Sequence, residues 1–110
     1  MIKVNTREMR ILLMYDIYYI NEDDNKLYNK FIKELYKLGY VRLQYSIYSK
    51  IIPTHLQYNS EKKKLLRIIP KNSNIRIAIL TEKQYQNIEI LNGTKSKNEL
   101  YNLEEDYIKL

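Results

Sequence analysis

One aspartate stands out as a residue that could do chemistry. Asp16 directly follows a run of residues, 9–15, that is apolar at almost every position. A carboxylate placed there can hold a hard cation such as Mg²⁺, and the metal can orient and activate water for attack on a phosphodiester. The same residue can instead cap the turn that follows the strand. The residues alone leave both roles open and favour the turn cap.

Other groups that do chemistry are scarce. The chain has no cysteine and one histidine, His55, which excludes disulfides, thiolate centres and multi-histidine metal sites within one subunit. His55 falls at the expected start of a helix, where a solvent-exposed role is the better interpretation. Ser46 could polarise a phosphate or make a structural hydrogen bond. A single carboxylate per subunit is sparse for hydrolysis, so catalysis by this chain stays open.

Charge favours a polyanionic partner. The net charge is +6, and the first 97 residues carry 18 basic and 9 acidic side chains, so a basic body precedes a slightly acidic tail. Four basic residues lie on or beside expected strands and are candidates for binding nucleic acid: Arg10, Arg42, Lys50 and Arg76. Phosphate contacts need positive charge and carry no sequence information. Any nucleic acid bound through such contacts should be bound with little sequence preference, although each cation taken singly also fits an ordinary solvated surface.

The first half of the chain predicts a strand and a helix that would position Asp16. Residues 9–16 are apolar on both alternating faces, which is typical of a central strand covered on both sides. Residues 26–38 read as an amphipathic helix that Gly39 ends. Its apolar stripe consists of Leu27, Phe31, Leu35 and Leu38.

The second half predicts a hairpin, a helix and a strand. Residues 40–52 alternate like one long bent strand, or like two strands joined tightly near Ser49 and Lys50. Thr54 can cap a second helix that runs to about Ile69. Residues 74–81 predict another strand and residues 88–91 a last short one, with residues 82–86 as a short connection.

This order predicts an α+β chain with a ferredoxin-like βαββαβ fold and an additional short C-terminal strand. The expected organisation is an N-terminal extension at 1–8, one domain at 9–93 and a polar tail at 94–110. Two helices cover one face of such a sheet, yet residues 9–16 and 74–81 are apolar on both faces. An identical subunit is the simplest cover for the second face, so we expect a homodimer. Asp16 would lie on that dimer side.

Several segments in one order resemble a known family. Three segments resemble parts of the second core CRISPR adaptation protein, a family of ferredoxin-like endoribonucleases. Its opening strand, which ends in a signature aspartate, is similar to residues 9–16 (MRILLMYD). Its glycine and its Gln-x-Ser strand are similar to Gly39-Tyr40 and to residues 44–49 (QYSIYS). The end of the folded region is similar in sequence to the subgroup found with type II systems: residues 81–85 (TEKQY), then 88–91 (IEIL) and Gly93. The likeness covers about residues 9–93.

The resemblance implies a role in CRISPR spacer acquisition. A symmetric dimer of this family lies at the centre of the acquisition complex, between two dimers of the adaptation integrase, with double-stranded DNA across it. Many members are classed as magnesium-dependent endoribonucleases or endodeoxyribonucleases. The resemblance thus implies Asp16 as the catalytic and metal-binding residue, with one Mg²⁺ shared by the two Asp16 of a dimer.

Three functions compete. The leading one is a duplex-binding scaffold of the integrase, with nuclease activity weak or vestigial. The second is a magnesium-dependent, toxin-like endoribonuclease acting on single-stranded RNA. The third is an RNA-binding module of the RRM type, which fares worst because residues 74–81 contain no aromatic side chain for stacking. The sequence shows no apolar run of membrane-spanning length and no signal peptide, so we expect a cytoplasmic protein without a membrane partner.

Overall fold

The computed structural model describes residues 8–17 and 22–95 and has the predicted ferredoxin-like βαββαβ order. Its elements are β1 (Met9–Ile17), α1 (Glu22–Lys37), β2 (Val41–Gln44), β3 (Ile47–Ile52), the 3₁₀ helix η1 (His55–Gln57), α2 (Tyr58–Leu66), β4 (Ser73–Thr81) and α3 (Glu82–Gln86). The strands form one antiparallel sheet in the order β2-β3-β1-β4. None of the described helices is long and apolar enough to cross a membrane.

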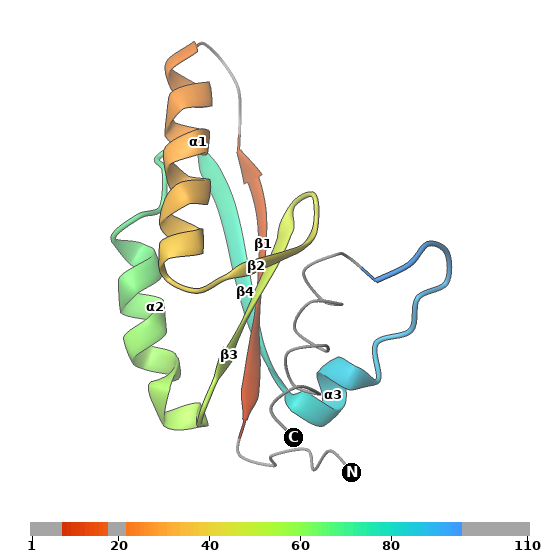
Figure 1. The fold of residues 1–110 in the computed structure, drawn as a ribbon. Helices are drawn as coiled ribbons and strands as arrows, with labels where there is room; N and C mark the ends of the chain where they lie inside the picture. The colour runs from red at the N-terminus through yellow and green to blue at the C-terminus, as the bar shows by residue number, and fades with distance from the viewer. Residues whose placement is uncertain (1–7, 18–21, 96–110) are drawn as a thin grey trace.

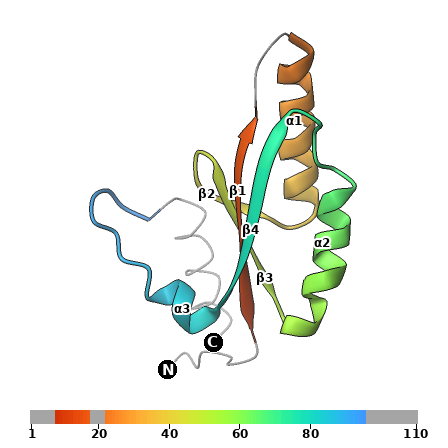
Figure 2. The ribbon, with the colours of Figure 1, turned by 180° about the vertical axis from the view of Figure 1, so that it is seen from behind.

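The two long helices cover one face of the sheet. Figures 1 and 2 show α1 and α2 on one side and α3 with the segment after it on the other. The core between helices and sheet is made of Ile11, Leu13, Tyr15, Phe31, Leu35, Tyr40, Tyr48, Ile52 and Leu65. Alternation along β1 thus points its odd-numbered residues at the helices and leaves Leu12, Met14 and Asp16 on the opposite face, here called the open face.

Helix α1 begins earlier than the apolar stripe predicted. It starts at Glu22 rather than residue 26, because Glu22, Asp23 and Asp24 place negative charge in the first turn, where the helix dipole favours it. Phe31 and Leu35 of the predicted stripe are buried. Leu27 is 43% exposed, since the start of α1 projects beyond the end of the sheet (Figure 1).

Glycine ends α1 as predicted. Gly39 has a φ of +96°, a left-handed conformation that glycine adopts without steric cost. The amide N–H of Tyr40 then bonds the carbonyl oxygen of Leu35 at 3.0 Å, which brings the chain back into β2.

Two connections differ from the prediction. The β2–β3 turn falls at Tyr45 and Ser46, not near Ser49 and Lys50, and it follows an irregularity in pairing between Arg42 and Gln44. The second helix ends at Leu66 rather than near Ile69, and it is preceded by η1. Thr54 precedes η1 in an extended conformation but makes no side-chain capping bond.

The predicted additional strand at residues 88–91 is wrong for the single chain, because this segment pairs with no described strand and is irregular. The expected connection at residues 82–86 is instead the helix α3. Thr81 caps α3 by accepting a hydrogen bond from the Gln84 amide at 3.0 Å, while the Gln84 side chain accepts one from the Thr81 amide at 2.8 Å. This reciprocal cap stabilises the start of α3 directly after β4 ends at Thr81.

Candidate functional site

Asp16 lies where its place in β1 predicts. Its side chain is exposed on the open face, one residue before the strand ends. The residue directly opposite in β4 is Asn74, and the next pair along the same face is Met14 with Arg76. Paired strand residues share a face, so a carboxylate, an amide and a guanidinium meet at this corner of the sheet.

The corner of the sheet at Asp16 has few side chains that could bind a metal ion. Among residues 8–17 and 22–95 no three acidic, histidine or cysteine side chains gather closely enough to hold a metal ion. Asp16 supplies a carboxylate and Asn74 an amide oxygen, both of which are hard donors. Mg²⁺ commonly binds one or two protein carboxylates and keeps several waters. The residues therefore fit an ion shared between two copies better than an ion bound by one chain.

His55 lies far from Asp16 along the sheet. β3 runs antiparallel to β1, with Ile52 opposite Met9, so η1 follows at the end of the sheet where β1 begins. Asp16 is at the other end of β1. His55 is exposed and its ring centroid lies 6.3 Å from that of Tyr58. The two residues therefore cannot act on one bond within a single chain.

Two of the four predicted nucleic-acid-binding residues are neutralised inside the fold. Arg10 is 6% exposed, and its guanidinium forms a bidentate pair with Glu82 at 2.7 and 3.2 Å. Lys50 donates to the buried Glu61 at 2.8 Å, and that carboxylate also lies 3.6 Å from Lys64. The carboxylates lie 72 residues from Arg10 and 11 residues from Lys50 along the chain, on other elements of the fold, which explains why charge counting treated these cations as available.

The other two differ in exposure. Arg42 is half-buried on the edge strand β2 and donates to the Tyr45 carbonyl oxygen at 3.1 Å. Arg76 is exposed on the open face near Asp16. Further exposed cations lie on and after α2: Lys62, Lys63, Lys64, Arg67 and Lys71. The exposed positive charge is thus on α2 and β4 more than on β1 and β3.

Tyrosines fill the space between β1, β3 and the start of α1. The Tyr15 and Tyr28 hydroxyls are 2.8 Å apart, and the Tyr15 ring lies 5.9 Å from those of Phe31 and Tyr48. Burial raises the pKa of Tyr48 to about 12, and the nearby Tyr36 hydroxyl adds to the shift. Burial, followed by the hydrogen bond with Tyr28, raises the pKa of Tyr15 still further. These hydroxyls therefore stay protonated and act as structural groups.

Stability should fall steeply in alkali. Tyrosines of the unfolded chain lose their protons near pH 10, whereas folded Tyr48 keeps its proton until about pH 12. Above pH 10 the unfolded state binds fewer protons, so each such tyrosine lowers the free energy of unfolding by up to about 1.4 kcal/mol per pH unit. Urea unfolding from about pH 8 to 11 measures this slope. Tyr48→Phe should reduce it, and stability that stayed constant up to pH 11 would contradict the assignment.

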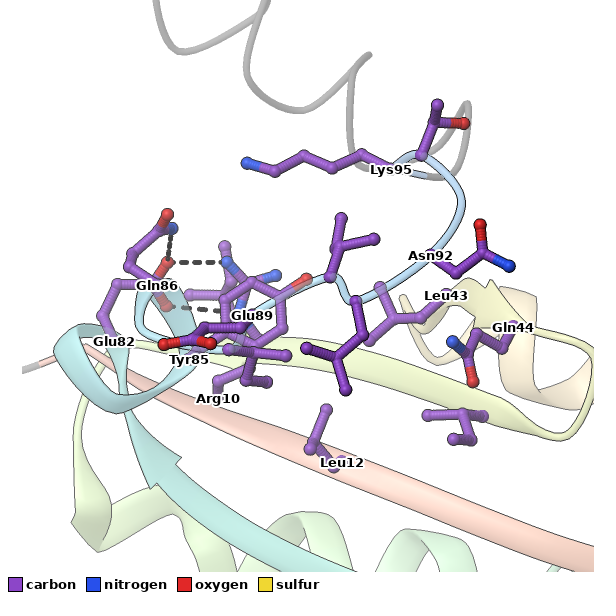
Figure 3. Close-up of a pocket in the computed structure, with 16 residues that line it drawn as sticks. Arg10, Leu12, Leu43, Gln44, Glu82, Tyr85, Gln86, Glu89, Asn92 and Lys95 are labelled. Carbon is purple, nitrogen blue, oxygen red and sulfur yellow. Dashed lines mark hydrogen bonds and ion pairs between the residues drawn. The ribbon is translucent and has the colours of Figure 1, made fainter.

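A cavity of about 530 Å³ lies on the open face (Figure 3). Its floor is formed by side chains of β1, β2 and β3, including Leu12, Leu43 and Ile51, and its wall by α3 and the chain that follows to Lys95. Arg10 anchors this wall: besides its pair with Glu82, its guanidinium carbon lies 3.9 Å from the centre of the Tyr85 ring. Gln86 also donates to Glu82 at 2.9 Å. These contacts place α3 across the beginning of β1.

The fold has counterparts in known proteins. Residues 9–88, which span all four strands, match the family described as CRISPR associated protein Cas2. The chain belongs to the Cas2 family. Its resemblance to CRISPR adaptation proteins, inferred from a few segments, is thereby confirmed across the folded region.

Curated relatives agree along most of the chain. "CRISPR-associated endoribonuclease Cas2" of Campylobacter jejuni is 37% identical over 101 residues, covering 92% of this chain and 71% of the relative. The protein of that name from Treponema denticola is 31% identical and covers 93% of this chain and 100% of its own length. The Streptococcus mutans protein is 33% identical, with 79% and 80% covered.

Solved structures share the fold. The crystal structure of Streptococcus pyogenes Cas2 at pH 6.5 superposes with a TM-score of 0.56 at 24% identity, covering 76% of this chain and 99% of that one. A second structure, titled "Crystal structure of cas2", has a TM-score of 0.55 at 20% identity and covers 82% and 92%. The ferredoxin-like assignment therefore rests on three-dimensional similarity as well as on element order.

Proposed function

We propose that this Cas2-family chain serves in CRISPR adaptation as a homodimer that binds double-stranded DNA and acts as a scaffold for the adaptation integrase. The observation that carries the proposal is the family match over residues 9–88. The net charge of +6 supports a polyanionic partner. The basic residues, rather than a specificity pocket, would make the contact with DNA.

The open face supports the dimer. Met14 and Ile51 are 37% and 39% exposed there, although both are apolar and lie on inner strands of the sheet. β4 is an edge strand, so its outer backbone groups can pair with a strand from another chain. Ile88 and Ile90, 52% and 48% exposed, belong to the segment that would add to the partner's sheet edge by β-augmentation.

Exposed cations support duplex binding. Lys62, Lys63 and Arg67 are exposed on and just after α2, and Arg76 is exposed on the open face. Lysine and arginine contacts to phosphate fix a protein on a duplex without reading bases. The proposed scaffold therefore binds DNA with little sequence preference.

The proposal includes a magnesium ion bound by Asp16. Two copies of Asp16, brought together across the open face, would hold one ion with waters and Asn74 nearby. When bound, such an ion supplies orientation and activation of water for attack on a phosphodiester. Asp16 itself holds the cation, and Arg76, one pair along the strand, adds positive charge for a phosphate.

A second candidate is a magnesium-dependent endoribonuclease, toxin-like in activity and acting on single-stranded RNA. It is favoured by the word endoribonuclease in the names of the curated relatives. The sparse chemistry of the site weighs against it, since no group of three acidic, histidine or cysteine side chains gathers among the described residues. Reconstitution with an integrase separates the two candidates.

Two measurements test the scaffold. Light scattering at micromolar concentration should give twice the mass of one 13.4 kDa chain. Duplex affinity should fall by about tenfold for every two phosphates contacted when salt rises fourfold, because counterions are released on binding. A duplex of scrambled sequence serves as control and should bind equally well. A stable monomer, or affinity that is independent of salt, would overturn the proposal.

A further inference from the structure

An exposed aromatic ring stands at the β2–β3 turn. Tyr45 is the first residue of the two-residue connection between β2 and β3, and 72% of its surface is accessible. Its ring therefore adds little to the core. By contrast, Tyr40 and Tyr48, in the same stretch of chain, are almost completely buried. The exposure of Tyr45 is a property of the turn and not of tyrosines in this fold.

The backbone under this ring is firmly held. The Tyr45 carbonyl oxygen accepts hydrogen bonds from the Arg42 guanidinium and from the Tyr15 hydroxyl, both at 3.1 Å. The next carbonyl, of Ser46, accepts from the Tyr15 amide at 3.1 Å. The turn is thus fixed to the end of β1, immediately before Asp16. A ring on a fixed turn loses little conformational entropy when a ligand stacks on it.

A positive charge accompanies the ring. The guanidinium carbon of Arg42 lies 4.9 Å from the centre of the Tyr45 ring, within the range of a cation–π interaction. The exposure of Tyr45 leaves ring surface for a second planar group. An aromatic ring beside an arginine has the composition of sites that stack a nucleobase and attract its phosphate.

We propose that Tyr45, supported by Arg42, is a stacking site for an unpaired nucleobase. Bases inside a duplex already stack on their neighbours, so this site would select an overhang, a frayed end or a single-stranded RNA. A base stacked on the turn would bring its strand to the end of β1 that carries Asp16. This proposal rests on the proposed function, because the bound nucleic acid would bring the strand to Tyr45. It adds a separate prediction, namely that unpaired nucleotides increase affinity.

Binding of three probes to the full chain tests the proposal. The probes are a blunt DNA duplex, the same duplex with short unpaired overhangs, and a single-stranded RNA of the overhang sequence. Overhangs should tighten DNA binding by about 5- to 100-fold, the range that stacking of one base provides. Tyr45→Ala should abolish this gain and leave blunt-duplex affinity unchanged, whereas Tyr45→Phe should keep it. The RNA arm reports which kind of strand the site prefers.

A control separates stacking from loss of apolar surface. Leu56→Ala removes a side chain that is 89% exposed on η1, at the opposite end of β3, and should leave all affinities unchanged. Tyr45→Leu keeps an apolar cover over Arg42 but cannot stack, so it should behave like Tyr45→Ala. If any of the three Tyr45 variants fails to fold, as judged by circular dichroism, the fluorescence of 2-aminopurine in the overhang reports stacking on the wild-type chain.

Each outcome decides between the two proposals. Equal affinity of the wild-type chain for blunt and overhanging duplexes, or an overhang gain that survives in Tyr45→Ala, overturns the stacking site and leaves the scaffold standing. Binding of unpaired strands without binding of blunt duplex supports the stacking site and overturns the duplex scaffold. Binding of no probe overturns both.

Discussion

Glu82→Gln should lower the free energy of unfolding by about 3–5 kcal/mol, the cost of leaving a buried charge without its partner. Arg10 and Glu82 have side chains only 7% and 10% exposed, and their bidentate pair joins β1 to α3. The amide of glutamine keeps the size of the side chain but removes the charge. Urea unfolding followed by circular dichroism measures the difference.

Two matched variants sharpen this result. Glu34→Gln removes an exposed ion pair with Lys37, at 3.4 Å, and should change stability by less than about 1 kcal/mol. The double variant Arg10→Met with Glu82→Leu should recover most of the loss, because an apolar pair of similar volume often replaces a buried ion pair at little cost. If Glu82→Gln were as harmless as Glu34→Gln, the ion pair would not hold α3 in place.

Asp16→Asn should remove every effect of Mg²⁺ on the protein. Two carboxylates close together at a dyad repel each other, and a shared cation relieves that repulsion, so Mg²⁺ should raise the melting temperature of the wild-type dimer. Any metal-dependent hydrolysis should fall by at least about 100-fold, since even residues that only support metal ligands cost 10- to 100-fold when replaced. Calorimetry with and without Mg²⁺ and a cleavage assay provide the readouts.

The control for this variant is Asp23→Asn, which removes an exposed carboxylate from the first turn of α1. It should leave the Mg²⁺ effect intact. Duplex binding should survive in Asp16→Asn, because it depends on exposed lysine and arginine side chains and not on the Asp16 carboxylate. Integration with the partner should also survive if the chain is a scaffold, and loss of integration with DNA binding retained would favour the nuclease. Undiminished metal-dependent cleavage would falsify the role of Asp16.

Alternation of side chains predicted the position of Asp16 and failed to predict its surroundings. Side-chain alternation along residues 9–16 places Ile11 and Leu13 on one face of the strand and Leu12 and Asp16 on the other. The structure confirms this division between the two faces. The ferredoxin-like fold followed from the succession of elements along the chain. Alternation also made residues 88–91 look like a strand. Alternation assigns a side chain to a face but does not supply a pairing strand, and the described part of the single chain provides none.

Two features of the site left no local trace in the sequence. The turn at Tyr45 and Ser46 contains none of the glycine, proline or asparagine that usually marks a hairpin, so its position could not be read. The pair of Arg10 with Glu82 joins residues 72 positions apart, and only the finished fold brings them together. Counting charges therefore overestimated the cations that face solvent.

The central place of β1 has a consequence for synthesis of the chain. β1 pairs on one side with β3 and on the other with β4, so both of its edges remain bare until residues far downstream have been made. Its sequence is apolar and rich in strand-forming residues, which is the composition of segments prone to aggregate. Arg10 and Asp16 flank the five residues between them with opposite charges. In the nascent chain these two residues would act as gatekeepers against self-association, before either takes its place in the folded protein.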